Sequence, residues 1–190
     1  MKKRVGILGG TFNPPHIGHL IIANEVLCAL GLDEVRFMPN YEPPHKQKMD
    51  SVSVEDRLAM VSLAIADHPK FTIEEIELLR MGKSYTYDTM VLLKEREPET
   101  EFYFIIGGDM IEYLPKWYRI EELCKLVQFV GVKRPNYSVD TPYPVLIVDV
   151  PEIQLSSSLI RKKIAKNETV KYLLPDSVIA YIKENRLYET

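Results

Sequence analysis

The stretch of this 190-residue sequence best suited to chemistry runs from Gly9 to His19, GGTFNPPHIGH. Glycines at its start let the backbone approach a ligand closely, because no Cβ stands in the way. The helix expected to follow presents free N–H groups and the positive end of its dipole, which together favour a phosphate. His16 and His19 are three residues apart, so both can project from the first helical turn toward one anion, and Gly18 keeps that surface clear. The stretch therefore predicts a phosphate cradle for a nucleotide.

The alternative is an ordinary strand-to-helix turn with two solvent-facing histidines. The chain has four histidines, and the presence of two in this one turn, beside glycines and prolines, favours the cradle. The spacing matches neither the dinucleotide pattern G-x-G-x-x-G nor the P-loop pattern G-x-x-x-x-G-K-[ST]. Besides the two histidines, the residues expected to contact the nucleotide here are Gly9, Gly10, Thr11, Phe12 and Gly18.

A second stretch, from Ser156 to Arg161 (SSSLIR), could hold phosphate from another direction. Serines before a helix cap it and offer hydroxyl donors, so Ser156, Ser157 and Ser158 are candidates. Arg161 lies about one turn later, and its rigid guanidinium can clamp phosphate oxygens. By itself this pattern fits a plain capped helix, but together with the first stretch it favours a second phosphate clamp.

The elements that must position these residues follow from hydrophobic periodicity. Apolar runs alternate with helical patterns along the chain, which predicts an α/β fold with a parallel sheet and right-handed crossovers. We expect one domain over residues 1–190, with a small C-terminal helical part over about 156–190. The predicted strands are Arg4–Leu8, Glu34–Met38, Phe71–Ile73, Phe102–Ile106, Leu126–Val132 and Val145–Val150. The predicted helices are Ile17–Leu30, Ser53–Ala66, Tyr85–Arg96, Ser157–Lys166 and Pro175–Asn185.

Composition narrows the class of protein. Apolar residues make up 46% of the chain and charged residues 27%, as in ordinary globular proteins, and the net charge of −3 lacks the basic footprint of a nucleic-acid-binding protein. The apolar run at the start is too short for a signal peptide, and none approaches the ~20 residues of a membrane span. We therefore expect a cytoplasmic protein with no membrane or nucleic-acid partner. Cys28 and Cys124 lie in apolar, helix-like contexts, which predicts two buried thiols and neither a disulfide nor a metal site.

Residues 16–19 spell His-Ile-Gly-His, which resembles the HxGH signature shared by nucleotidylyltransferases and class I aminoacyl-tRNA synthetases. The synthetases also carry a KMSKS loop, and the string Lys46–Met49 is misplaced and incomplete for one. The stretch Ser156–Arg161 resembles the late I-S-S-T-x-I-R motif of the nucleotidylyltransferases, with Leu155 and Ser158 as mild departures. The resemblance implies a Rossmann-like sheet with helices on both faces.

Within that superfamily the chain resembles the bacterial nicotinate mononucleotide adenylyltransferases along nearly its whole length. One point of resemblance is the polar loop that starts at Asn40 and contains Pro43-Pro44-His45-Lys46. The resemblance places Asn40, His45 and Lys46 near the mononucleotide, with Lys46 also near the reacting phosphates. A solvated basic loop is the alternative. Many relatives have Asp where this chain has Asn13, and asparagine keeps the local hydrogen-bonding geometry without the charge.

Three further points of resemblance concern the second substrate and the adenosine part of ATP. Backbone N–H groups around Thr86 bind the nicotinate carboxylate in the family, and a helix N-terminus suits a carboxylate better than a neutral carboxamide. The resemblance implies that Trp117 stacks on the pyridine ring and that the backbone of Tyr118 helps to hold the carboxylate, whereas simple packing is the alternative for each segment. Gly107 and Asp109, at the carboxyl end of a predicted strand, lie where such sheets bind ligands, and Asp109 can accept hydrogen bonds from ribose hydroxyls. Arg134 corresponds to an arginine near the adenine and the phosphates.

The resemblance implies adenylyl transfer from ATP to nicotinate mononucleotide, with Mg²⁺ bound along with ATP and with His16, His19, Lys46 and Arg161 as the catalytic residues. Because relatives are often dimers or larger, a homodimer is a candidate state. Two alternatives stay open at this point. One is a related adenylyl- or cytidylyltransferase, such as one acting on pantetheine phosphate, and the other is a nucleotide-sensing module without catalysis.

Overall fold

The computed structural model describes residues 2–41, 52–82, 85–132 and 141–189. Its centre is a sheet of six parallel strands in the order β3-β2-β1-β4-β5-β6. The order reverses between β1 and β4, which is the arrangement of a Rossmann-like fold. The strands are β1 (Arg4–Gly10), β2 (Glu34–Pro39), β3 (Phe71–Ile73), β4 (Glu101–Gly107), β5 (Gln128–Val132) and β6 (Val145–Val148).

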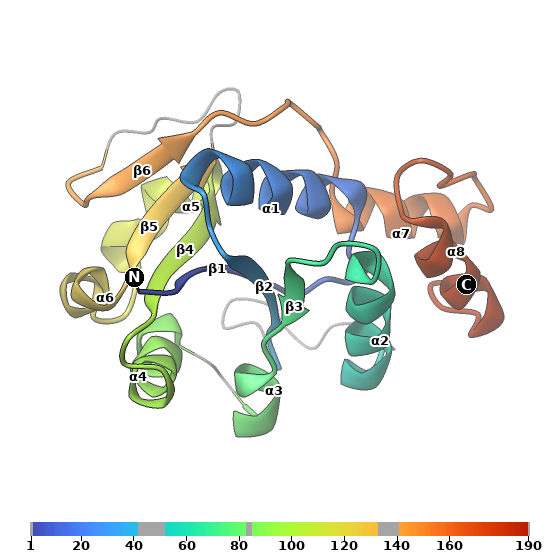
Figure 1. Ribbon diagram of the computed structural model, residues 1–190. Coiled ribbons are helices and arrows are strands. Elements are labelled where there is room, and N and C mark those ends of the chain that lie inside the picture. Colours follow the sequence, from blue (N-terminus) through green and yellow to red (C-terminus); the bar gives the residue numbers. More distant parts are fainter. Residues whose placement is uncertain (1, 42–51, 83–84, 133–140, 190) are drawn as a thin grey trace.

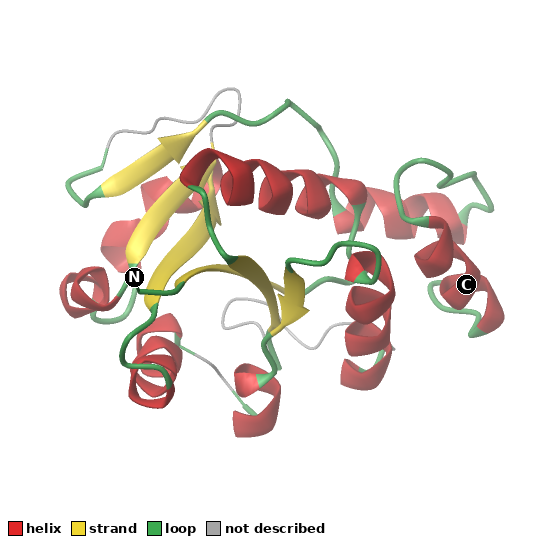
Figure 2. Cartoon of the chain, viewed as in Figure 1, coloured by secondary structure: helices red, strands yellow, loops and turns green. Residues whose placement is uncertain are grey.

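Helices cover both faces of the sheet, as predicted (Figures 1 and 2). One apolar cluster joins a face of the sheet to α1 (Ile17–Leu30), α2 (Val54–Ile65), α7 (Ser157–Ala165) and α8 (Asp176–Glu184). A second cluster joins the opposite face to α3 (Ile76–Arg80), α4 (Thr86–Arg96), α5 (Gly108–Tyr113), the 3₁₀ helix η1 (Leu114–Lys116) and α6 (Ile120–Leu126). The helices of the described part of the chain fall short of the length and apolar character that a bilayer-spanning helix needs.

The alternation of side chains along the strands explains the two clusters. In β4, Phe102, Phe104 and Ile106 belong to one cluster, whereas Tyr103 and Ile105 belong to the other. Successive side chains of a strand point to opposite faces, so an uninterrupted apolar run is what a strand buried on both sides requires.

The structure corrects several predicted boundaries. The sequence analysis missed α3, α5, η1 and α6, which have at most seven residues each and are too short to show helical periodicity. The strand predicted from Leu126 begins at Gln128, because Leu126 is the last residue of α6. The last strand ends at Val148, two residues before the predicted Val150.

The prediction of two buried thiols was wrong for Cys28. That side chain is exposed because it lies on the outer side of α1, while its neighbours Val26 and Leu27 face the core. Cys124 is half-buried, and burial raises the pKa of its thiol.

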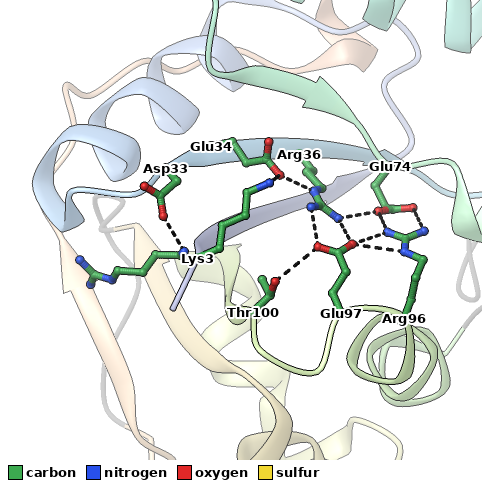
Figure 3. Close-up of polar contacts among 9 residues, drawn as sticks. Lys3, Asp33, Glu34, Arg36, Glu74, Arg96, Glu97 and Thr100 are labelled. Atoms are coloured by element: carbon green, nitrogen blue, oxygen red, sulfur yellow. Dashed lines mark hydrogen bonds and ion pairs between the residues drawn. The ribbon is translucent and has the colours of Figure 1, made fainter. Parts of the chain in front are cut away.

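A network of charges joins the strands to α4 at Arg36 (Figure 3). The guanidinium of Arg36 is buried and bonds Glu97 with both terminal nitrogens, at 2.6 and 2.8 Å. It also donates to Glu34 at 2.8 Å and to Glu74 at 3.2 Å, and Arg96 pairs with the same Glu74. Because the buried charge is surrounded by carboxylates, this network neutralises itself.

The strand ends that matter for function lie at one edge of the sheet. In the register of the sheet, Gly10 at the end of β1 pairs with Pro39 of β2, and Gly107 at the end of β4 pairs with Val132 of β5. Since β1 and β4 are neighbours, the segments that follow them meet where the strand order reverses. Open α/β sheets bind ligands at this point.

Candidate active site

The loop after β1 is compact and partly strained. Gly9 is exposed and Gly10 is half-exposed at the end of the strand, whereas Phe12 is buried with a φ of 49°. Residues other than glycine adopt this left-handed region at a cost, and such residues cluster at functional sites. Thr11 is half-buried between the glycines and this strained position.

His16 and His19 form one unit at the start of α1. His16 is the N-cap and is buried, its ring stacks on that of His19 with centroids 3.7 Å apart, and its backbone N–H donates to His19 Nδ1 at 3.1 Å. Because Nδ1 accepts this bond, the proton of a neutral His19 ring lies on Nε2. The edge of Phe12 contacts the same ring, with centroids 5.0 Å apart.

Gly18 makes room for the ring of His16. A Cβ at this position would lie 3.0 Å from Nδ1 of His16 and 3.1 Å from its Cε1, so the space beside the glycine is filled by that ring. Gly18 therefore lets the His16 ring pack against the first turn of the helix.

The C-terminal clamp reaches the same loop. Ser157 Oγ donates to the carbonyl oxygen of Pro14 at 2.8 Å, and Arg161 Nη1 donates to that of Asn13 at 2.8 Å. The structure thus brings Arg161 and the first loop together across 148 residues of sequence. Figure 1 shows α7 lying beside the N-terminal end of α1.

The three serines differ in what they do. Ser156 is the N-cap of α7 and accepts a hydrogen bond from the backbone N–H of Leu159 at 3.2 Å. Ser157 is engaged by the loop, and Ser158 is exposed and accepts from Arg161 Nη2 at 3.3 Å. Their hydroxyls are therefore tied first to the protein itself.

Tyr188 is a contact residue of the loop that the sequence analysis missed. Its hydroxyl donates to Oδ1 of the buried Asn13, and Met60 Sδ lies 4.0 Å away. Burial raises the pKa of this phenol, so it remains a donor at neutral pH. Tyr188 lies one position before Glu189, the last described residue, and a lone tyrosine there offers no periodic signal that would have identified it.

Arg57 on α2 is the second missed residue. It is buried, donates from Nη1 to the carbonyl of Thr11 at 2.8 Å, and donates from Nη2 to the carbonyls of Asn40 and Tyr41 at 2.7 and 3.2 Å. The sequence contains a signal for this residue: Arg57 stands three positions before Met60, on the face of the helix that otherwise carries apolar residues. Asn40 itself follows β2, its N–H donates to the carbonyl of Gly10 at 3.0 Å, and its Oδ1 is buried without a hydrogen-bond partner in the described ranges.

The segments predicted for the second substrate also meet. Thr86 is the first residue of α4, and the preceding Tyr85 contacts the ring of Tyr118 with centroids 5.0 Å apart. Tyr118 is exposed and also contacts Tyr87, at 6.1 Å. Trp117 is half-buried and packs edge-on against aromatic rings of β4 and β5, so its packing role is real.

The remaining predicted residues are described only in part. Gly107 is the N-cap of α5, and Asp109 lies in the first turn of that helix. His45, Lys46 and Arg134 lie outside the described residues.

Comparison with known proteins identifies the family. Residues 7–163 match the cytidylyltransferase-like family. The chain is 56% identical to the probable nicotinate-nucleotide adenylyltransferase of Enterococcus faecalis, over 99% of this chain and 86% of that protein. It is 54% identical to the nicotinate-nucleotide adenylyltransferase of Bacillus subtilis, over 99% of this chain and all of that protein. The chain belongs to the family of nicotinate-nucleotide adenylyltransferases.

Solved structures with much lower sequence identity share the fold. The nicotinic acid mononucleotide adenylyltransferase of Plasmodium falciparum complexed with NaAD superposes with a TM-score of 0.83, over 98% of this chain and 97% of that chain. The same protein complexed with APC superposes with a TM-score of 0.80. At 22% and 21% identity these matches show the fold of the family and leave its residue roles to be tested.

Proposed function

We propose that this protein transfers the adenylyl group of ATP to nicotinate mononucleotide, giving nicotinic acid adenine dinucleotide and pyrophosphate. The observation that carries the proposal is the identity of 54% or more, over nearly the whole chain, to relatives named nicotinate-nucleotide adenylyltransferase. As part of the same proposal, the reaction takes place in the cytoplasm, and the protein acts as a single domain whose candidate assembly is a homodimer.

In the proposed reaction a phosphate oxygen of the mononucleotide attacks Pα of ATP in line. The new bond joins that oxygen to Pα, and the bond from Pα to the oxygen bridging to Pβ breaks, so that pyrophosphate leaves with its electron pair. The protein contributes no nucleophile, and it acts by positioning the substrates and stabilising charge on the transferred group.

The first loop would hold ATP through its phosphates. The 3.1 Å bond to Nδ1 of His19 places the proton of its neutral ring on Nε2, and through this N–H His19 would bind the α- and β-phosphates together with His16. Arg161 and the serines Ser156, Ser157 and Ser158 would lie at the β- and γ-phosphates, and Arg161 would exchange its bond to Asn13 or share it with a phosphate. The same nucleotide would be lined by Gly9, Gly10, Thr11, Phe12 and Gly18. The rest of ATP would contact Gly107, Asp109 and Arg134. Lys46 would lie between the two substrates.

Nicotinate mononucleotide would lie against α4. The N-terminal N–H groups of α4 at Thr86 and the backbone of Tyr118 would bind the carboxylate. The contact between the rings of Tyr85 and Tyr118 brings these two segments together. Trp117 would stack on the pyridine ring, and Asn40, His45 and Asp109 would contact the remainder. A carboxylate gains from the helix dipole where a carboxamide does not, so we propose a preference for nicotinate over nicotinamide.

We propose that Mg²⁺ enters with ATP. The described groups around the expected phosphates are imidazoles, amide N–H groups, a guanidinium and serine hydroxyls that already bond within the protein, whereas Mg²⁺ prefers oxygen ligands such as carboxylates, phosphates and water. This donor set fits a metal ion held by phosphate oxygens and water. When bound, the ion would neutralise part of the charge on the phosphates, while the side chains position them.

The deciding experiment measures pyrophosphate release by the purified protein. Mixed with ATP and Mg²⁺, it should turn over nicotinate mononucleotide faster than nicotinamide mononucleotide, and it should not turn over pantetheine phosphate. Faster release with pantetheine phosphate would favour the related transferase, and no release with any acceptor would favour a nucleotide-sensing module.

The variant His19→Ala tests the role of the first loop. We expect kcat to fall by a factor of about 100 or more, as on removal of one donor to a developing charge. His68→Ala is a matched control, since its ring stacks on Phe71 at 3.7 Å and its Nδ1 accepts a backbone N–H at 3.2 Å, outside the site. A folded His19→Ala protein with full turnover would contradict the proposed mechanism.

A further inference from the structure

Arg57 is a buried cation whose partners are unusual. Its side chain is 5% exposed, and its three hydrogen bonds all go to backbone carbonyls. In the described ranges no carboxylate pairs with it, and burial lowers the pKa of its guanidinium from the ordinary value without removing its charge. A buried charge costs several kcal/mol unless it is compensated, so its retention needs a reason.

Arg36 of β2 shows what a self-contained buried arginine looks like in the same fold. That side chain is 8% exposed and is surrounded by Glu34, Glu74 and Glu97, all at 3.2 Å or less. Its charge is therefore cancelled within the protein. In the described part of the chain the guanidinium of Arg57 bonds only neutral carbonyls, and Tyr188 and Glu55 act on it without forming an ion pair, so most of its charge remains as positive potential at its place in the fold.

That place is the edge of the sheet where ATP is proposed to bind. Arg57 holds the carbonyl of Thr11 from the loop after β1, and those of Asn40 and Tyr41 from the segment after β2. The backbone bond from Asn40 to Gly10 at 3.0 Å joins the same two segments. One side chain thus fixes two strand ends relative to each other.

The guanidinium also polarises the loop. In a trans peptide the C=O and N–H groups point in opposite directions, so a cation on the Thr11 carbonyl strengthens the N–H of Phe12 as a donor away from Arg57. The positive charge of Arg57 and the polarised peptide between Thr11 and Phe12 both favour an anion on the far side of the loop.

We propose that Arg57 is a positioning residue for ATP, which ties the loops after β1 and β2 together and supplies an uncancelled positive charge beneath the triphosphate. The inference rests on the proposed function for the identity of the ligand. It assigns to a helix outside the two phosphate-binding motifs a part in binding ATP.

The test compares Arg57→Gln with Arg57→Lys, and uses Arg4→Gln as the matched control. Arg4 begins β1 at the opposite end of the strand, and its Nη1 likewise donates to a backbone carbonyl, that of Leu30 at 2.6 Å. All three proteins are measured for binding of the ATP analogue whose Pα–Pβ bridging oxygen is replaced by carbon, for KM of each substrate, and for kcat.

We expect Arg57→Gln to weaken binding of the analogue about tenfold, since the substitution removes the attraction between one buried positive charge and the phosphates. KM for nicotinate mononucleotide should change far less than KM for ATP. Arg57→Lys keeps the charge but cannot span both loops, so its binding should stay within about threefold of the wild type while kcat falls about tenfold. Arg4→Gln should leave all of these values within about twofold.

Binding by Arg57→Gln within twofold of Arg4→Gln would overturn the inference, and so would wild-type kcat in Arg57→Lys. If Arg57→Gln does not fold, the kcat of Arg57→Lys decides. The analogue binds without an acceptor, so failure of the wild type to turn over nicotinate mononucleotide would refute the proposed function and still leave the role of Arg57 measurable.

Discussion

The hydrogen bond from Tyr188 to Asn13 makes the C-terminal tail part of the first loop, and Tyr188→Phe removes that bond by deleting one oxygen atom. The ring can stay in place, so the loss is confined to the hydroxyl. Asn13 is 3% exposed, and its Oδ1 would then be buried without its donor. A buried acceptor left unsatisfied costs about 1–3 kcal/mol.

The assay is urea unfolding at neutral pH together with steady-state kinetics. We expect a loss of about 1–3 kcal/mol in the free energy of unfolding, or ~2–4 °C in Tm for each kcal/mol in a chain of this size. The carbonyl of the same Asn13 accepts from Arg161, so loosening this residue should also move Arg161 and lower kcat/KM for ATP about three- to tenfold.

Tyr172→Phe provides the control, because that tyrosine is 83% exposed in the same C-terminal part. If Tyr188→Phe were as stable and as active as Tyr172→Phe, the bond to Asn13 would carry no weight and the reasoning would be refuted. A loss of stability with unchanged kcat/KM would show that the tail supports the fold without positioning the loop.

Two other perturbations test the network of Figure 3 and the histidine unit. The bonds from Arg36 hold the pKa of Glu97 at about 2, below its ordinary 4.5, so its contribution is present above pH ~4.5 and is lost as the pH falls toward 2. After allowance for screening of a side chain that is 23% exposed, this is ~2 kcal/mol, and acid unfolding of Glu97→Gln should show a correspondingly shallower pH dependence than the wild type. Gly18→Ala places a methyl group 3.0 Å from the His16 ring, so kcat should fall about tenfold or more although alanine favours helices, and wild-type turnover would mean that the ring position is irrelevant.

Much of the fold could be predicted because its signals are local. The apolar run Phe102–Ile106 indicates a strand that is buried on both faces, and the helical spacing within Ile17–Leu30 indicates a helix that is buried on one face. Neither inference needs knowledge of the rest of the chain. The meeting of the first loop with Arg161 was also predictable, since the serines and the arginine of the late stretch favour a phosphate clamp when they are considered together with the first loop. Short helices such as α6 were missed because seven residues carry too little periodicity.

The supports of the loop could not be predicted in the same way. Arg57 contacts Thr11 across 46 residues, and Tyr188 contacts Asn13 across 175. Arg57 stands on the apolar face of its helix, which indicates burial but no partner, and Tyr188 resembles an ordinary aromatic residue of a tail. Their roles depend on which backbone carbonyl the tertiary fold places beside them, and periodicity and motif spacing contain no information on that placement.

The chemistry of these supports explains how the loop can serve a polyanion. Three donors from two helices, α2 and α7, reach its oxygen atoms: Arg57 the carbonyl of Thr11, Arg161 that of Asn13, and Ser157 that of Pro14. Tyr188 adds a fourth donor at the side chain of Asn13. Carbonyl oxygens facing a phosphate would repel it, so turning them toward donors inside the protein removes that repulsion. At Thr11 it also turns the N–H of the same peptide, that of Phe12, away from Arg57, whereas the peptides that follow Asn13 and Pro14 end in prolines and have no N–H. Because the supports also fix the loop before ATP arrives, the ordering cost is met on folding rather than on binding, which is what catalysis by positioning requires.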